Sequence, residues 1–176
     1  FTDEGLGEEA EEVLLRAVAR IEDIEKQLLE NGASPAALSG FREMQASALV
    51  SLAVNANVRL NAPERAREYY ERAYALRKDE FMRTLLACYR ARSGAETEAR
   101  ALLRTIQPGP GTWYNLACTH ALLGDVEEAL EFLRAELEQN HATEESRARQ
   151  MEWAAEDPDL ASLRDDPRFR RLVRVD

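Results

Sequence analysis

The sequence has few of the residues that disulfide frameworks, metal sites and sheets require. Only two cysteines, Cys88 and Cys118, and two histidines occur among its 176 residues, which is too few for a disulfide framework. We find no alternating run of β-branched residues that predicts a strand, and no long apolar stretch or secretory leader. The eight glycines and six prolines fall between periodic segments. These absences favour an all-helical chain that neither crosses a membrane nor depends on disulfides.

Basic side chains are also scarce relative to acidic ones, 23 against 33, which gives a net charge of −10. We expect no nucleic-acid partner, because neutralising phosphates takes a basic face. Residues 1–58 carry 4 basic and 11 acidic groups, residues 59–104 carry 11 and 7, and residues 105–176 carry 8 and 15. The basic middle segment leaves two interpretations open, a surface for an acidic ligand or ordinary exposed helix pairs.

Residues capable of catalysis do not form a recognisable motif. Neither Cys88 nor Cys118 has a second cysteine or histidine at the spacing of zinc ligands, and both fit small positions on tightly packed helices. No nucleophile motif is present, and acidic runs such as Glu127-Glu128 fit solvated helix faces. We therefore expect no enzyme activity, no cofactor and no metal.

Apolar residues at three- and four-residue steps predict a series of helices. Asn31-Gly32 ends the first of them, and Ser34 with Pro35 starts the second as N-cap and first helical residue. Gly40 is a candidate break or kink in the second helix. The predicted helices span residues 8–30, about 35–60, 63–77, 80–93, 95–106, 112–123 and 125–139.

Part of the chain is duplicated at an offset of 30 residues. The segment Leu86-Ala87-Cys88 recurs as Leu116-Ala117-Cys118. One hairpin of two helices cannot cover its own apolar faces, so the duplication predicts hairpins stacked side by side around a continuous core. Further matches in the same register pair Gly94 with Gly124, Glu98 with Glu128, Ala99 with Ala129, Leu103 with Leu133 and Arg104 with Arg134.

The C-terminal segment has the pattern of a structural cap. Asp157-Pro158 and Asp166-Pro167 each combine an N-cap residue with a first-turn proline. A stack of hairpins needs a cover on its open apolar end, and we expect Trp153 on the preceding helix to join it. The apolar residues available for this cover are Leu160, Leu163, Phe169, Leu172 and Val173.

The last hairpin resembles the tetratricopeptide repeat, and the C-terminal segment resembles that of bacterial members. The family's first-helix Trp, Leu and small residue, its turn Gly-Asp and its second-helix Ala correspond here to Trp113, Leu116, Ala117, Gly124, Asp125 and Ala129. The middle hairpin has Arg83 in place of the Trp, and Glu136 and His141 depart from the pattern at the end of the last one. The resemblance extends over roughly residues 45–141.

This resemblance implies an all-α fold of stacked antiparallel helical hairpins, a right-handed superhelix with an extra N-terminal helix and a C-terminal cap. We assign residues 1–44 to the N-terminal helix and the start of a long second helix, residues 45–141 to about three hairpins, and residues 142–176 to the cap. The resemblance also predicts a bacterial, cytoplasmic protein. The first residue is Phe1 rather than Met, so we expect a piece of a longer protein.

In that family the first helix of each hairpin lines a concave groove that binds a peptide or a partner helix. The alternative is that these positions are solvated or covered by the N-terminal helix. Ser51 stands where the chaperone-binding members carry a lysine, so we expect no binding of chaperone tails. The predicted partner-binding residues are Ser51, Asn55, Arg59, Phe81, Thr84, Arg92, Tyr114 and Asn115.

The resemblance therefore predicts a protein-interaction module, an adaptor or scaffold, for another protein or peptide. An acidic partner and self-association through the N-terminal helix remain open. The alternative function is a regulatory or oligomerisation segment of a larger multidomain enzyme whose catalytic part lies outside this sequence.

Overall fold

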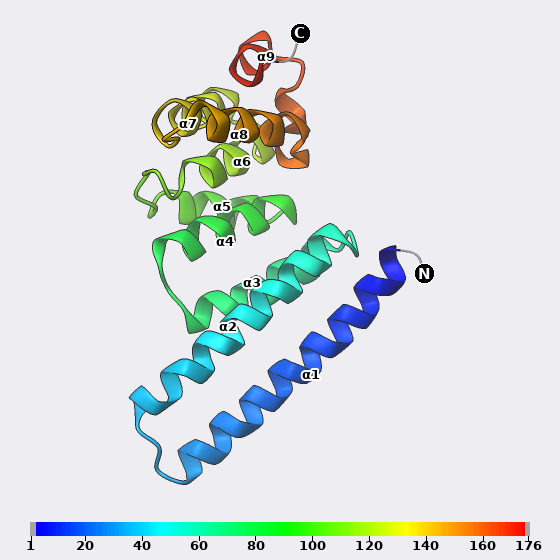
Figure 1. Cartoon of the computed structure of the whole chain (residues 1–176), viewed down its shortest axis with the longest axis vertical. Helices are drawn as coiled ribbons and strands as arrows, with labels where there is room; N and C mark the ends of the chain where they lie inside the picture. The colour runs from blue at the N-terminus through cyan, green and yellow to red at the C-terminus, as the bar shows by residue number, and fades with distance from the viewer. Residues whose placement is uncertain (1–2, 175–176) are drawn as a thin grey trace. The chain divides into compact units, whose positions relative to one another are not determined.

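A computed structural model describes residues 3–174, with side chains from Gly5 onward, so the start at Phe1 lies outside the described residues. This range is all helical, without a strand, as predicted (Figure 1). The chain divides into two compact units, Phe1–Met82 and Arg83–Asp176. The elements are α1 (Asp3–Glu30), α2 (Pro35–Val58), α3 (Pro63–Leu76), α4 (Glu80–Arg92), α5 (Glu96–Leu103), α6 (Trp113–Leu122), α7 (Val126–Gln139), α8 (Glu144–Glu156), the 3-10 helix η1 (Pro158–Leu163) and α9 (Pro167–Val173).

Local capping chemistry sets the start of α2. The hydroxyl of Ser34 accepts a hydrogen bond from the Ala37 N–H at 3.3 Å, and Pro35 opens the helix, as predicted. Gly40 does not interrupt α2, which runs on to Val58. A glycine inside a helix costs only about 1 kcal/mol, and the buried apolar side chains on either side of Gly40 hold the helix together.

Three helices end on a glycine in the left-handed region. The φ angles are +78° at Gly32, +77° at Gly94 and +78° at Gly124. After Gly94 the N–H of Ala95 donates to the carbonyl five residues back at 2.8 Å, and Asp125 repeats this bond after Gly124 at 2.9 Å. Such a bond satisfies a carbonyl that the helix end leaves open. The duplicated glycines thus close equivalent turns, which the sequence repeat predicted.

The first unit is built on α1, α2 and α3. Figure 1 shows α1 and α2 running antiparallel, joined by a short turn. Ala53 and Ala56 of α2 and Ala66 and Ala73 of α3 are fully buried, and their small side chains let the two helices approach closely. The larger side chains of this core include Leu49, Leu52 and Tyr70.

The second unit contains α4 from Arg83 onward with α5, and α6 with α7. Matched positions have matched burial, since Ala99 and Ala129 are both fully buried. Cys88 lies on α4 and Cys118 on α6, and each is 2% exposed. Arg100 of α5 donates to Asp125, in the turn of the next hairpin, at 2.7 Å. The repeat in sequence is therefore a repeat in structure.

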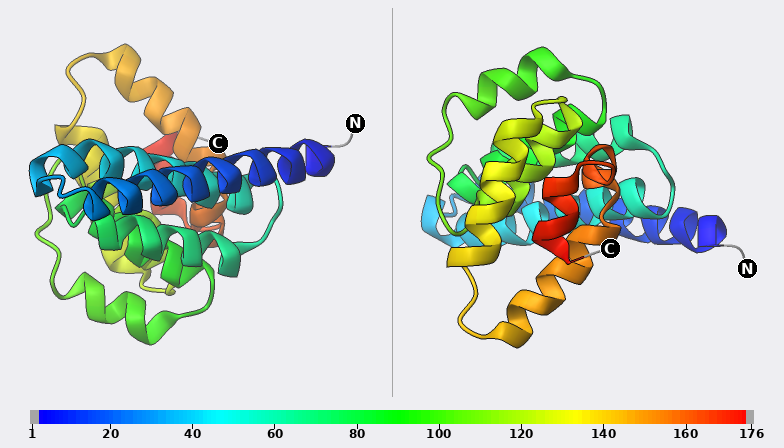
Figure 2. Two further views of the ribbon diagram at one scale, coloured as in Figure 1. Left: turned by 90° about the horizontal axis from the view of Figure 1, so that it is seen from below. Right: turned by 90° about the horizontal axis from the view of Figure 1, so that it is seen from above.

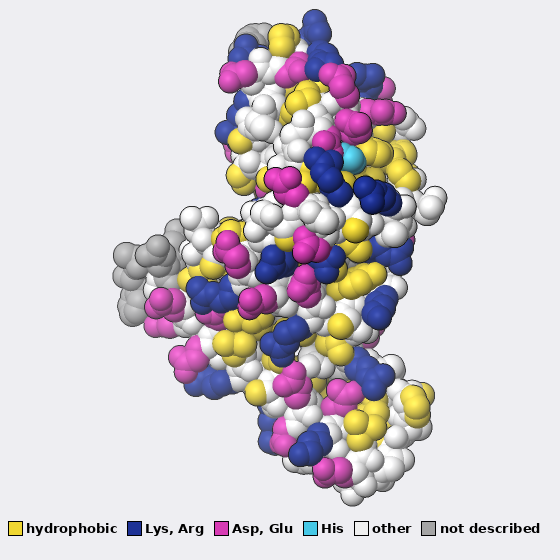
Figure 3. Space-filling model, turned by 180° about the vertical axis from the view of Figure 1, so that it is seen from behind, with side chains coloured by type: hydrophobic (Ala, Val, Ile, Leu, Met, Phe, Trp, Pro, Cys, Tyr) yellow, Lys and Arg dark blue, Asp and Glu magenta, His cyan; other side chains and the backbone are white. Residues whose placement is uncertain are grey.

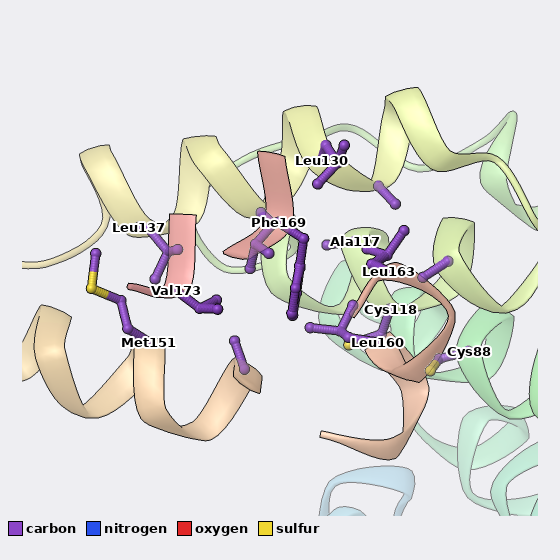
Figure 4. Packing of buried hydrophobic residues seen from close by; sticks show 14 residues of the cluster. Cys88, Ala117, Cys118, Leu130, Leu137, Met151, Leu160, Leu163, Phe169 and Val173 are labelled. Atoms are coloured by element: carbon purple, nitrogen blue, oxygen red, sulfur yellow. The ribbon is translucent and has the colours of Figure 1, made fainter. Parts of the chain in front are cut away.

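The C-terminal elements pack against the second of these hairpins. Asp157 and Asp166 are N-caps, as predicted, and accept hydrogen bonds from the N–H groups of Asp159 and Arg168 at 2.9 and 2.7 Å. Figure 2 shows η1 and α9, orange to red, beside the yellow-green helices, and Figure 4 shows their side chains in one cluster. The buried members from this segment are Leu160, Leu163, Phe169 and Val173, with Leu172 partly buried.

Trp153 does not join this cluster, so that expectation is wrong. Its side chain is 64% exposed. α8 turns Met151 and Ala154 toward the core instead, and a helix that buries both of these positions carries the intervening Trp153 on its outer side. The aromatic ring is left at the surface.

Acidic and basic side chains are interspersed on the face drawn in Figure 3 and do not separate into patches of one sign. Within residues 3–174, no helix combines the length and the apolar character needed to cross a bilayer.

Candidate functional site

The eight predicted partner-binding residues divide between the two units. Four fall in the first unit, namely Ser51, Asn55, Arg59 and Phe81, and four in the second, namely Thr84, Arg92, Tyr114 and Asn115.

Three of the first group line one groove between α1 and α2. This α1–α2 groove has a volume of about 450 Å³. Helix α2 supplies the predicted Ser51, Asn55 and Arg59. The remaining lining residues are apolar, namely Ala10 and Leu14 of α1 and Val50, Val54 and Val58 of α2. Phe81, the fourth predicted residue of this unit, lies on α4 and is 49% exposed.

The three valines of the groove follow from the register of α2. Val50, Val54 and Val58 recur every four residues and so share one face of the helix. The face toward α3 is occupied by alanine and leucine instead. Val54 is 48% exposed and Val58 71% exposed. Sequence reasoning missed these valines, although their spacing is the signal that marks them as one stripe.

Asn55 connects the groove to α1. Its side-chain nitrogen donates a hydrogen bond to the main-chain oxygen of Gly7 at 2.8 Å. A Cβ at Gly7 would lie 2.7 Å from Cδ2 of Leu60, so a larger residue there requires the Leu60 side chain to shift. Asn55 is 8% exposed, and its side-chain oxygen has no hydrogen-bond partner among the described residues. This carbonyl oxygen is buried, so a ligand in the groove does not reach it without a local rearrangement.

Arg59 provides the positive charge at one end of the groove. Its guanidinium is exposed and forms no ion pair with any other side chain that the structure describes. Arginines on α3 behave differently, because Arg65 binds Glu11 at 2.8 Å and Arg72 binds Glu22 at 3.1 Å. These pairs hold α1 in place on the side away from the groove and leave Arg59 available.

In the second unit, two predicted residues bind the chain's own C-terminal segment. Arg92 pairs with the carboxylate of Asp159 through two nitrogens, and the Nε–Oδ1 distance is 2.9 Å. The Tyr114 hydroxyl donates to Asp157 at 2.8 Å. The acidic ligand of this face is thus the segment that starts η1.

The remaining two residues of this group are less open. Thr84 is fully buried, so its side chain reaches no ligand without a rearrangement of its unit. Asn115 is half-buried on α6 beside Tyr114. Thr84 is therefore not placed to bind a partner, whereas the binding role of Asn115 stays a prediction.

Burial keeps the two thiols of this unit neutral. It raises the pKa of Cys88 to about 12. Burial, together with the carboxylates of Asp157 and Asp159, raises the pKa of Cys118 well above its ordinary value. Cys118 Sγ and carboxylate oxygens of Asp157 and Asp159 lie within 4.8 Å of one another. A metal ion there would compete with the guanidinium of Arg92, so we assign this cluster to anchoring the C-terminal segment.

Antiparallel hairpins at a fixed interval, with glycine-closed turns and alanines where helices cross, define a helical-repeat protein. Residues 110–139, which hold α6 and α7, match the family model of the tetratricopeptide repeat. This hairpin is therefore similar to one tetratricopeptide repeat, as the resemblance predicted. No curated protein and no solved structure matches the chain.

Proposed function

We propose that this protein is a protein–protein interaction module that receives a helix of its partner in the α1–α2 groove. The observation that carries the proposal is the meeting of Ser51, Asn55 and Arg59 with the exposed Val54 and Val58 in that groove. The groove thus offers an apolar wall and, in Arg59, a cation that pairs with no other described side chain.

The dimensions support a helical ligand. The stripe from Val50 to Val58 covers about two helical turns, roughly 12 Å. A partner helix with apolar residues at matching three- and four-residue steps fills such a groove. An acidic residue of that helix then pairs with Arg59, which is the acidic-partner version of the sequence hypothesis.

The contacts in the second unit also favour the α1–α2 groove as the binding site. Arg92 and Tyr114 bind Asp159 and Asp157, so the chain's own C-terminal segment already occupies the face that they line. In this proposal residues 45–141 form the hairpins and residues 142–176 the cap of a bacterial, cytoplasmic adaptor, with no catalytic role.

Selection from a displayed library of helical peptides tests the proposal. The wild-type chain should enrich peptides with apolar residues at i and i+4 and one acidic residue nearby. The double variant Val54→Glu, Val58→Glu should lose them. Met44→Glu is the matched control, because Met44 is 57% exposed on the same helix but outside the groove.

Circular dichroism checks that the three proteins share the same helix content. If the double variant selects the same peptides as the wild type, or if a monomeric wild type selects none, the groove is not a binding site.

A further inference from the structure

We infer that the helix received by the α1–α2 groove is α1 of a second copy of this chain. This inference rests on the proposed function, since it names the occupant of the same groove. It also develops the oligomerisation role that the sequence left open.

The outer face of α1 carries the pattern that the groove requires. Leu6 is 45% exposed and Val13 is 56% exposed. Both lie on one stripe of the helix, with Glu9 between them at a three-residue step from Leu6. Glu9 is exposed and forms no ion pair with the side chains from Gly5 to Arg174.

The inner face of α1 is already used within its own copy. Glu11 accepts hydrogen bonds from Arg65 at 2.8 Å and from the Tyr69 hydroxyl at 3.0 Å. Asn55 binds Gly7 on the same side. Burial, together with Glu11, raises the pKa of Tyr69, so its hydroxyl stays a donor. The exposed stripe of Leu6 and Val13 is therefore presented by a helix that is fixed in place.

Charge complementarity favours a second copy. The exposed start of α1 is acidic, with Glu8, Glu9 and Glu12 in its first turns. The groove ends at Arg59, which pairs with no other described side chain. Residues 1–58 carry 11 acidic against 4 basic groups, so α1 of any copy brings negative charge to a groove that offers positive charge.

The surface is also self-complementary, as a two-fold interface must be. Each copy supplies the same stripe and the same groove. A two-fold axis over the groove puts α1 of each copy on α2 of the other, with Leu6 and Val13 against Val54 and Val58. The symmetry then forms the Glu9–Arg59 pair twice.

Sedimentation velocity of the full chain gives the first test, over about 1–200 µM, where weak interfaces assemble. The wild type should show a concentration-dependent dimer. Val58→Glu should weaken the dimer by about tenfold or more, because it buries a charge without a partner. Met44→Glu should sediment like the wild type. A wild type that stays monomeric over this range overturns the inference.

A charge exchange gives the sharper test. Glu9→Arg alone sets two arginines against each other twice in the dimer, and Arg59→Glu alone sets two glutamates against each other twice. Each variant should therefore dimerise about tenfold more weakly than the wild type. A one-to-one mixture of the two variants restores both opposite-charge pairs, so dimer should reappear in the mixture.

A mixture that associates no better than its components shows that Glu9 and Arg59 do not meet across copies, and overturns the inference. The peptide selection separates this failure from failure of the proposed function. If the wild type is monomeric yet enriches helical peptides through Val54 and Val58, the groove binds a different protein and only the second-copy inference fails. If the wild type is monomeric and enriches no peptide, both the proposed function and the second-copy inference fail.

Discussion

The side chain of Asn55 and the main chain of Gly7 are joined by a 2.8 Å hydrogen bond that spans 48 residues of sequence. It connects the last turns of α2 to the first turns of α1. Glycine favours the approach, because a Cβ at position 7 would press on the side chains of Leu60 and Arg59. Helix α1 is therefore an integral part of the first unit, and the groove beside it has a defined wall.

Gly7→Ala should loosen this contact. The added Cβ would lie 2.7 Å from Leu60 Cδ2 and 3.1 Å from Arg59 Cβ. Such overpacking typically costs about 1–3 kcal/mol, and the higher helix propensity of alanine offsets about 0.5–1 kcal/mol of it. Urea denaturation measures the loss. Gly40→Ala is the control, since nothing lies within 4 Å of its Cβ position and its φ is ordinary. It should stabilise the protein by about 0.5–1 kcal/mol. Equal effects of the two substitutions would contradict the packing argument.

Gly94 tests the turn that closes the first duplicated hairpin. An alanine there has room, but the φ of +77° puts its Cβ in the unfavourable left-handed region. Gly94→Ala should lower the free energy of unfolding by about 1–2 kcal/mol. Gly94→Asn should lose less, because asparagine tolerates this conformation. Denaturation curves of both variants measure these losses. If Gly94→Asn is no more stable than Gly94→Ala, space at this position and not the φ angle determines the loss of stability.

The Arg92–Asp159 pair should be the most sensitive polar contact of the second unit. The Asp159 side chain is 9% exposed and that of Arg92 is 22% exposed. Asp159→Asn leaves the guanidinium without its counter-ion, and breaking a buried pair in this way costs about 3 kcal/mol. Glu127→Gln removes an exposed partner of Arg168, and should change stability by less than about 0.5 kcal/mol. Similar losses in the two variants would show that the Arg92 pair is not special.

The two thiols should be unreactive in the folded protein. Cys88 and Cys118 are buried, and burial raises the pKa of both, to about 12 for Cys88. Because the thiolate is the reactive form, an aromatic disulfide reagent near neutral pH should label neither residue until the chain unfolds. In urea both should react at once. Rapid labelling under native conditions would mean that the C-terminal segment opens readily.

Acid should remove the contribution of Asp166. Hydrogen bonds from the side chain and backbone of Arg168 lower its pKa from 3.8 to about 2. A carboxyl with a depressed folded-state pKa stabilises fully above its unfolded value, and this stabilisation disappears as the pH falls from 3.8 through about 2. Asp166→Asn keeps a capping oxygen without the charge. Its melting temperature should lie below that of the wild type at about pH 6 and converge with it at about pH 2. A constant difference would exclude the carboxylate charge as the cause.

Features set by neighbouring residues were predictable from the sequence. Ser34 with Pro35 marked the start of α2, and Gly94 and Gly124 marked two turns, because a cap or a positive φ depends on a few adjacent residues. The duplication then identified equivalent helices. Fold class and most helix boundaries follow from these local rules.

Features set by distant residues were not predictable. Arg92 and Tyr114 have the register of groove residues, and nothing nearby in sequence shows that Asp159 and Asp157 occupy that face. The exposure of the valine stripe is equally hidden, because the sequence around Val54 does not show whether a neighbouring helix covers its side chain. The groove residues Ser51, Asn55 and Arg59 were found by register, while its valines needed the structure.

The anchoring of the C-terminal segment has a consequence for the length of the repeat. Asp157 and Asp159 stand two residues apart, yet one is held from α6 and the other from α4. Together these two contacts fix the distance between α4 and α6, the first helices of the two duplicated hairpins. An insertion or deletion in the connection between these helices would move Tyr114 or Arg92 away from its carboxylate. The contacts of the C-terminal segment, which follows both hairpins in sequence, thus constrain the 30-residue spacing of the repeat.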